Sequence, residues 1–298
     1  MAAVEVEKLH KSYSGKTAVM DLTFTVEPGE ILGLIGPNGA GKSSTIKMIL
    51  DFIRPDSGEV RLFDRRMAET LKHRIGYLPE EKGLYQNLPT MKLILYLASL
   101  KGLDASRARA RALDLLERTG MTDSADKRIK HLSKGMGQMI QLIVTTIHEP
   151  DIVILDEPFS GLDPVNTELT KTVIKDLRDQ GKSIILSTHQ MNQVEELCDR
   201  VLMINHGTTV LYGDLKETTA QFRRRSVLVN MEGEPGELPG VTRSSTYRDG
   251  FELALAPNAT PMEVLDALRE RRIVINRFEI ATPSLHEIFL KLAGENDE

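Results

Sequence analysis

The sequence has a single cysteine, Cys198, so no disulfide can form within the chain. Because a free cysteine is usually buried as a small apolar residue, we expect Cys198 to be structural. The sequence also lacks any apolar run that approaches the ~18 residues of a membrane-spanning helix. Its longest candidate, residues 93–98, is too short. If a protein with this sequence works at a membrane, another polypeptide must cross that membrane.

Two other features are missing: a targeting segment and an excess of positive charge. Residues 1–7 show no basic stretch followed by an apolar core, so we expect no signal peptide. The formal net charge is -5, which argues against a general nucleic-acid surface because phosphate binding needs clustered Lys and Arg. We therefore expect no nucleic-acid partner. With 41% hydrophobic and 27% charged residues, the chain has the balance of a globular protein that buries its own core.

The pattern of apolar residues predicts an α/β fold. Residues 31–35 form a continuous apolar run, which is typical of a strand buried on both faces. The runs at 152–155, 183–187 and 201–204 have the same character and alternate with helical segments. This order predicts right-handed crossovers and helices that cover a parallel sheet. Residues of about 84–150 have helical spacing and predict a helical subdomain.

Shorter segments flank these regions. Before the helical region, strands are predicted at 4–6, 23–26 and 57–62. After residue 220 the residue composition changes, and Gly and Pro cluster between 233 and 240 as in loops. The elements predicted beyond that cluster are strands near 251–255 and 273–275 and helices at 262–271 and from 284. We therefore predict one domain at 1–220 and a small α+β domain at 221–298.

A glycine-rich loop joins the apolar run 31–35 to a helical segment. It reads Gly36-Pro37-Asn38-Gly39-Ala40-Gly41-Lys42-Ser43 and is followed by Ser44, and it fits the pattern G-x-x-x-x-G-K-[ST]. The glycines let backbone N–H groups surround phosphate oxygens, and a helix N-terminus favours anions. We expect Lys42 to reach the β and γ phosphates of a nucleotide and the Ser43 hydroxyl to bind Mg²⁺.

Two acids follow the strand predicted at 152–155. Asp156 and Glu157 therefore lie at the carboxyl edge of the sheet, where α/β proteins bind ligands. We expect Asp156 to hold Mg²⁺ through water and Glu157 to polarise the attacking water. The acids and the glycine-rich loop together predict a P-loop nucleoside triphosphatase. They do not decide between its classes, although the absence of an Asn-Lys-x-Asp motif from the sequence weakens a GTPase interpretation.

Further motifs narrow the class. The run Leu132-Ser133-Lys134-Gly135-Met136-Gly137-Gln138 resembles the signature sequence of the ABC ATPase family, whose common form is Leu-Ser-Gly-Gly-Gln. The run Ser160-Gly161-Leu162-Asp163 resembles the D-loop of that family, which lines the dimer interface. His189 matches its switch histidine, and Tyr13 matches the aromatic residue that stacks on adenine. The motifs occur in family order over about residues 3–215.

The resemblance implies a fold and an activity. The expected fold is an ABC-type P-loop domain with an antiparallel β subdomain and a helical subdomain. ATP and Mg²⁺ are the expected cofactors, with Lys42, Glu157 and His189 as catalytic residues. Two cassettes are expected to enclose each ATP between one P-loop and the Ser133 and Gly135 of the opposite signature loop. A second copy of this chain is the expected second cassette, and a different cassette stays open as the alternative. A separate membrane permease would be the partner, which places the protein on the cytoplasmic face of the membrane.

The region 77–85 and the terminal helix from Pro283 resemble a bacterial subset that includes sodium-extrusion and drug- or antibiotic-efflux ATPases. Export is therefore the expected direction of transport. Three roles are open for the C-terminal domain: it aids dimerisation, it regulates turnover, or it mainly covers the surface of a sheet. A soluble ABC ATPase acting on ribosomes or DNA is the alternative function. Proteins of that kind usually carry two cassettes, a long coiled coil or zinc cysteines, and this sequence has none of these.

Three positions depart from the common family pattern. Glu80 occupies the place of a Gln that contacts Mg²⁺ and the attacking water, so a carboxylate is expected to bind the metal there. In the signature, Lys134 replaces a Gly and Met136 replaces a Gln. Lys134 is expected to add a positive charge near the γ-phosphate of the opposite ATP, whereas Met136 cannot form a strong hydrogen bond.

Overall fold

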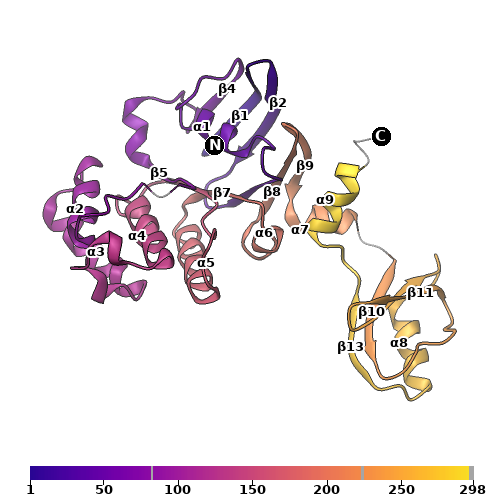
Figure 1. The fold of residues 1–298 in the computed structure, drawn as a ribbon. Helices are drawn as coiled ribbons and strands as arrows, with labels where there is room; N and C mark the ends of the chain where they lie inside the picture. The colour runs from indigo at the N-terminus through magenta and orange to yellow at the C-terminus, as the bar shows by residue number, and fades with distance from the viewer. Residues whose placement is uncertain (82, 223–224, 295–298) are drawn as a thin grey trace. The chain divides into compact units, whose positions relative to one another are not determined.

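The computed structural model describes residues 1–81, 83–222 and 225–294. Lys82, which belongs to the resemblance at 77–85, lies outside these ranges. The chain forms two compact units, Met1–Leu215 and Lys216–Glu298, and the sequence had placed this boundary at 220–221. Figure 1 shows the helices and strands of each unit. None of the described helices has both the length and the apolar character of a membrane span.

A six-stranded sheet forms the centre of the first unit. Its order is β5 (Ile75–Leu78), β6 (Ile152–Asp156), β7 (Ser183–Thr188), β3 (Ile31–Ile35), β8 (Arg200–Asn205) and β9 (Thr208–Asp214). Neighbouring strands are parallel except for β8 and β9. Every residue of β3, β6 and β7 is buried, as the continuous apolar runs predicted. The parallel order brings the ends of β3, β5, β6 and β7 to one edge.

Both faces of this sheet are covered (Figure 1). Helices α4 (Lys134–Thr146), α5 (Pro164–Asp179) and α6 (Met191–Leu197) lie on one face. Helix α1 (Lys42–Ile49) and an antiparallel sheet cover the other face. That sheet has the order β2 (Lys16–Val26), β1 (Val4–Tyr13) and β4 (Ser57–Leu62), which confirms the expected antiparallel β subdomain. Apolar side chains of both sheets and α1 form one continuous core.

Packing of α6 against the sheet explains the buried cysteine. A Cβ added to Gly33 of β3 would lie 2.7 Å from Val194 Cγ1 and 3.0 Å from Cys198 Sγ. Glycine in β3 therefore lets α6 approach the sheet closely. Cys198 is 8% exposed, and burial raises the pKa of its thiol. The expectation of a structural cysteine is confirmed.

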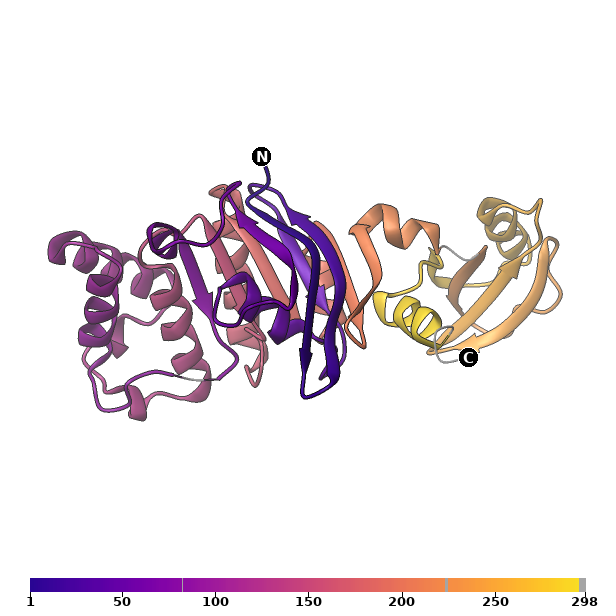
Figure 2. The same cartoon turned by 90° about the horizontal axis from the view of Figure 1, so that it is seen from above.

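The expected helical subdomain consists of α2 (Thr90–Leu100), α3 (Ala105–Arg118) and α4, with short 3-10 turns at Thr122–Ser124 and Ile129–His131. A further 3-10 turn, Glu69–Arg74, precedes β5. Asp104 begins α3 by accepting hydrogen bonds from the backbone N–H groups of Ser106 and Arg107. The three helices form one end of the first unit (Figure 2).

The second unit has the α+β character that the sequence predicted. It begins within α7 (Leu215–Gln221) and contains an antiparallel sheet in the order β11 (Val241–Tyr247), β12 (Gly250–Leu255), β10 (Ser226–Met231) and β13 (Ile275–Ile280). Helix α8 (Pro261–Glu270) packs on one face through buried Val264 and Leu268, and α9 (Leu285–Gly294) ends the described chain.

One strand prediction in this unit needs correction. The strand expected at 273–275 begins at Ile275 and extends to Ile280. Arg272 has a φ of 58°, and the N–H of Ile273 bonds to the carbonyl of Leu268, so these residues close α8. Pairing starts where Ile275 lies opposite Met231. Residues 273 and 274 therefore belong to the turn that follows the C-terminus of α8 and not to a strand.

Candidate functional site

The glycine-rich loop links β3 to α1, as predicted. A Cβ added to Gly36 would lie 2.2 Å from the carbonyl oxygen of Ile204, and one added to Gly41 would lie 2.4 Å from that of Ala18. Only glycine therefore fits these two positions. Lys42 is the first residue of α1 and is buried. Its ammonium turns back over the loop and donates to the carbonyl oxygen of Gly36 at 2.8 Å and of Pro37 at 3.2 Å.

Asp156 ends strand β6 beside this loop. Its side chain is buried, and its Oδ1 has no hydrogen-bond partner among the described residues. The same is true of the hydroxyl of Ser187, which lies opposite Asp156 in β7. Burial raises the pKa of Asp156, the adjacent Ser187 hydroxyl lowers it, and the negative charges of Glu80 and Glu157 raise it further. Buried oxygens without partners are suited to a cation or its bound water.

Glu157, the next residue, is held by the end of β7. Its Oε1 accepts hydrogen bonds from the backbone N–H of His189 at 3.0 Å and from His189 Nδ1 at 2.8 Å. Its Oε2 accepts from the hydroxyl of Thr188 at 3.2 Å. Glu157 has a φ of 49°, which is uncommon for a residue with a side chain and is often found at functional sites. The sequence did not single out Thr188 or Ser187, although both end an apolar strand at this edge.

These groups meet in a cleft of about 300 Å³. The cleft is lined by Ala18, Asn38, Gly39, Gly41, Lys42, Ser43, Ser44, Glu80, Asp156 and Glu157. Burial lowers the pKa of Lys42, while the negative charges of Glu157, Asp156 and Glu80 oppose this change. One buried cation, a glycine-rich loop at the start of a helix and three carboxylates suit a polyphosphate with a divalent cation. No motif in the sequence identified Ala18, from β2, as a residue of this cleft.

Besides the signature and D-loop residues, five predicted residues lie away from the cleft lining. Gly36, Pro37 and Ala40 belong to the loop but do not line the cleft. Tyr13 ends β1, is 43% exposed, and has the Lys11 ammonium 5.7 Å from its ring centre. His189 reaches the cleft through Glu157, and its side chain is 51% exposed.

The signature and D-loop residues form a separate group. Ser133 caps α4 by accepting from the N–H of Met136 at 3.2 Å. Asp163 caps α5 by accepting from the N–H of Asn166 at 2.9 Å. Gly135 is buried against Asn166. Ser133, Gly135 and Asp163 therefore lie together but do not line the cleft.

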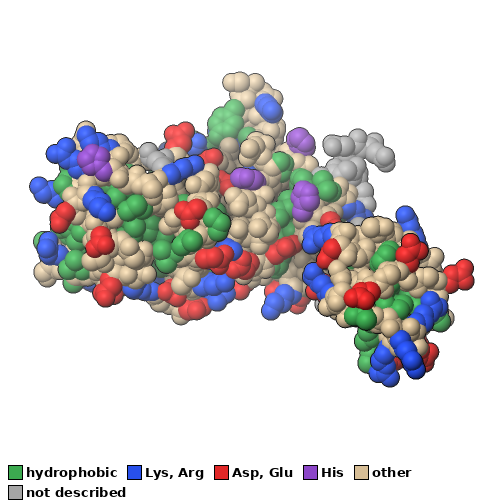
Figure 3. Space-filling view, turned by 60° about the horizontal axis from the view of Figure 1, so that its bottom comes forward, with side chains coloured by type: hydrophobic (Ala, Val, Ile, Leu, Met, Phe, Trp, Pro, Cys, Tyr) green, Lys and Arg blue, Asp and Glu red, His purple; other side chains and the backbone are tan. Residues whose placement is uncertain are grey.

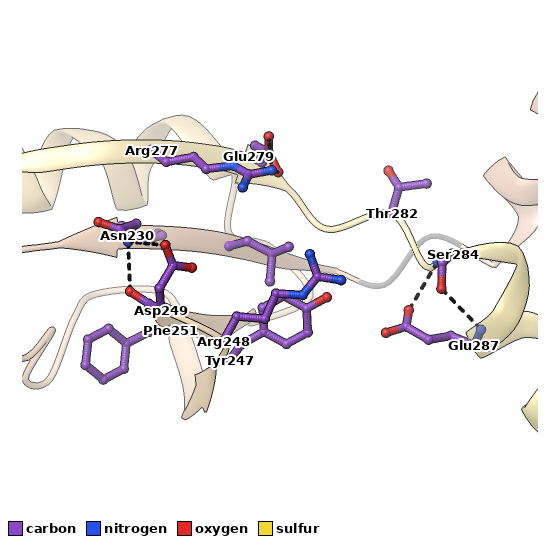
Figure 4. Close-up of a pocket in the computed structure, with 13 residues that line it drawn as sticks. Asn230, Tyr247, Arg248, Asp249, Phe251, Arg277, Glu279, Thr282, Ser284 and Glu287 are labelled. Atoms are coloured by element: carbon purple, nitrogen blue, oxygen red, sulfur yellow. Dashed lines mark hydrogen bonds and ion pairs between the residues drawn. The ribbon is translucent and has the colours of Figure 1, made fainter. Parts of the chain in front are cut away.

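The second unit contains a different pocket of about 190 Å³ on the sheet face opposite α8 (Figure 4). Its charged side chains mostly satisfy one another: Arg277 pairs with Glu279 at 2.8 Å, and Asp249 accepts from the Asn230 amide at 2.8 Å. None of the predicted site residues lies there. On the face seen in Figure 3, acidic and basic side chains are interspersed, as the modest net charge leads us to expect.

Comparison with known proteins agrees with this geometry. The family described as ABC transporter matches residues 19–160, and the family described as ATP-binding protein DrrA1-3-like, C-terminal domain, matches residues 213–293. The chain is 36% identical to the ABC transporter ATP-binding protein YhaQ of Bacillus subtilis, over 97% of this chain and 98% of the relative. It is 35% identical to the linearmycin resistance ATP-binding protein LnrL of the same organism, over 98% of each chain. The daunorubicin/doxorubicin resistance ATP-binding protein DrrA of Streptomyces peucetius is 30% identical, over 98% of this chain and 92% of the relative.

Solved structures lead to the same family. An ATP-binding subunit of an ABC transporter superposes with a TM-score of 0.69 and 32% identity, over 74% of this chain and 93% of that one. The protein cbiO1 of Clostridium perfringens, part of the ABC transporter complex cbiONQ, gives a TM-score of 0.67 and 26% identity, over 74% and 92% of the two chains. The chain belongs to the ABC transporter ATP-binding protein family and is an ATP-binding, ATP-hydrolysing subunit of a membrane transporter complex.

Proposed function

We propose that the cleft between the glycine-rich loop and the end of β6 binds and hydrolyses MgATP. The observation that carries this proposal is the meeting of Lys42, Asp156 and Glu157 in one cleft. The loop N–H groups and Lys42 hold the phosphates, and Tyr13 stacks on the adenine. Glu157 accepts a proton from the attacking water, and His189 holds that carboxylate in place.

Mg²⁺ fits the oxygen groups of the same cleft. Ser43, Asp156 and Glu80 are the residues that would hold it, and the buried Oδ1 of Asp156, which has no hydrogen-bond partner among the described residues, supports this. Bound Mg²⁺ neutralises charge that develops on the transferred phosphate. With Lys42 as the cation of the cleft, three carboxylates leave an excess of negative charge for a divalent cation to balance.

Two copies of this chain form the working unit in our proposal. Ser133, Gly135 and Asp163 do not line the cleft of their own chain, which supports a role in the site of a second copy. Light scattering of Glu157→Gln protein with MgATP tests this arrangement, because the variant binds ATP without hydrolysing it. We expect an ATP-dependent dimer and a wild-type turnover that rises faster than linearly with protein concentration. A protein that stays monomeric with saturating MgATP would contradict the homodimer.

A separate permease is the proposed membrane partner, and the direction is export because relatives such as LnrL and DrrA are named for drug resistance. The proposed docking site is an apolar groove of about 290 Å³ in the first unit. Residues that line it include Phe52, Tyr77, Leu97, Leu100 and His148. Docking there would hold the chain peripherally on the cytoplasmic face of the membrane.

A matched pair of variants tests this docking. Leu100 lines the groove and is 65% exposed, whereas Leu113 is 45% exposed and does not line it. Leu100→Glu is expected to abolish recovery of a multispanning protein in a pull-down from membranes of the source organism. Leu113→Glu is expected to leave recovery unchanged. Recovery of ribosomal RNA in place of a membrane protein would contradict the transporter assignment of the partner.

A further inference from the structure

A lysine of the signature loop contacts the D-loop of the same chain. A Cβ added to Gly161 would lie 1.9 Å from Lys134 Nζ and 2.5 Å from Lys134 Cε. The end of the lysine side chain therefore covers the side of the D-loop from which a larger residue would project. Gly161 has a φ of 67°, which glycine adopts at little cost. The sequence predicted another position for this ammonium, beside the γ-phosphate of the opposite ATP.

Two neighbouring contacts join the same two segments. Gln138 of α4 donates through Nε2 to the carbonyl oxygen of Pro158 at 3.4 Å. A Cβ added to Gly135 would lie 2.7 Å from Nδ2 of Asn166, so these residues pack closely. The start of α4 thus contacts the beginning, the middle and the end of the segment 158–166. That segment directly follows Glu157, so its position fixes the chain beyond the proposed base.

The contact with Gly161 depends on a side chain that the common signature lacks. With a glycine at position 134, the contacts described above would be reduced to Gln138 with Pro158 and Gly135 with Asn166, which lie on either side of the D-loop. Lys134 adds a third contact at the middle of the loop. We propose that Lys134 is a positioning residue for hydrolysis, which holds the D-loop through Gly161. The role rests on the proposed function, because the D-loop matters to turnover only if Glu157 acts in the MgATP site.

The kinetic constants distinguish this role from that of a phosphate-binding cation. A residue that only positions the D-loop changes kcat alone, whereas loss of a cation that contacts the phosphate also weakens ATP affinity. Lys134→Met keeps the apolar stem and removes the ammonium. We expect it to lower kcat about fivefold with the KM for ATP unchanged. A fivefold effect lies within the range of interaction energies between residues in contact. Lys134→Arg is expected to restore most of the lost kcat.

Gly161→Ala supplies the second half of the experiment. Its Cβ displaces the Lys134 ammonium but keeps the positive charge, and its backbone strain is the same whichever residue stands at 134. We expect Gly161→Ala to lower kcat, and Lys134→Met to have little further effect in the Gly161→Ala protein. Additive losses would overturn the proposal, as would a raised KM with normal kcat in Lys134→Met. Failure of the Glu157→Gln protein to dimerise with ATP would contradict the proposed dimer with two shared ATP sites. The kcat values of the two single variants and the double variant would still test the contact between Lys134 and Gly161.

Discussion

His189 holds Glu157 through two atoms, with its backbone N–H 3.0 Å and its Nδ1 2.8 Å from the same carboxylate oxygen. Because a carboxylate only accepts, the hydrogen of this bond lies on Nδ1. Glu157 is buried while the His189 ring is half exposed. The histidine therefore fixes the carboxylate from the solvent side of the cleft.

Substitutions of His189 test this support. We expect His189→Ala to lower kcat by about 10²-fold, because Glu157 loses the side chain that orients it. His189→Asn keeps a donor near the position of Nδ1 and is expected to regain about tenfold of that loss. Steady-state ATP hydrolysis measures both. Equal activity of the two variants would show that the histidine acts through Nε2 and not through Glu157.

Lys42→Met removes the only cation that lines the cleft among the described residues. Since Lys42 is buried among groups that bind phosphate, we expect kcat to fall by about 10²- to 10³-fold and ATP affinity to weaken. Isothermal titration with MgATP and hydrolysis assays measure the two effects. The control is Lys47→Met on the exposed side of α1, which is expected to resemble wild type. Similar losses in both variants would contradict the specific role of Lys42.

Glu80→Gln removes one of three carboxylates that line the cleft. We expect ATP binding to persist and the Mg²⁺ concentration for half-maximal hydrolysis to rise by about three- to tenfold, because a charge becomes a dipole. The control is Glu81→Gln, an exposed neighbour that does not line the cleft. A Mg²⁺ titration of the ATPase rate compares the variants. Identical turnover and Mg²⁺ dependence in Glu80→Gln and wild type would exclude a role for Glu80 at the metal.

His148 makes stability depend on pH. Its Nε2 donates to the carbonyl of Ile75 at 3.1 Å, and its buried Nδ1 has no partner among the described residues. Burial, together with the Lys101 charge, lowers the pKa of His148 from 6.5 to about 4. The unfolded chain therefore binds the proton first, and stability is lost as pH falls from about 6.5 towards 4. Protonation would leave a buried N–H without an acceptor.

Urea unfolding at pH 7 and pH 5 measures this effect. We expect the midpoint to fall further in wild type than in His148→Gln, whose amide can still donate to Ile75 but does not titrate in this range. The difference between the two proteins isolates His148 from the carboxyl groups that titrate in both. Parallel pH dependence would mean that His148 is protonated in the folded protein with little cost.

The order of elements in the first unit followed from local patterns. The apolar runs of β3, β6 and β7 predicted strands buried on both faces because such strands have no polar side to alternate with. The sequence pattern of the glycine-rich loop predicted its conformation, because close backbone approaches at Gly36 and Gly41 exclude any side chain. The structure also shows local hydrogen bonds at the starts of α4 and α5, because Ser133 and Asp163 cap these helices within one helical turn.

Other features depended on groups that meet only in the folded chain. The sequence could name Glu80 and Asp156 separately, but the parallel pairing of β5 with β6 brings them to one cleft. The start of β13 was misplaced because a strand is defined by its partner, here β10, and not by its own residues alone. The position of Lys134 over Gly161 was hidden for the same reason: a long flexible side chain has many reachable contacts, and only the tertiary structure selects one.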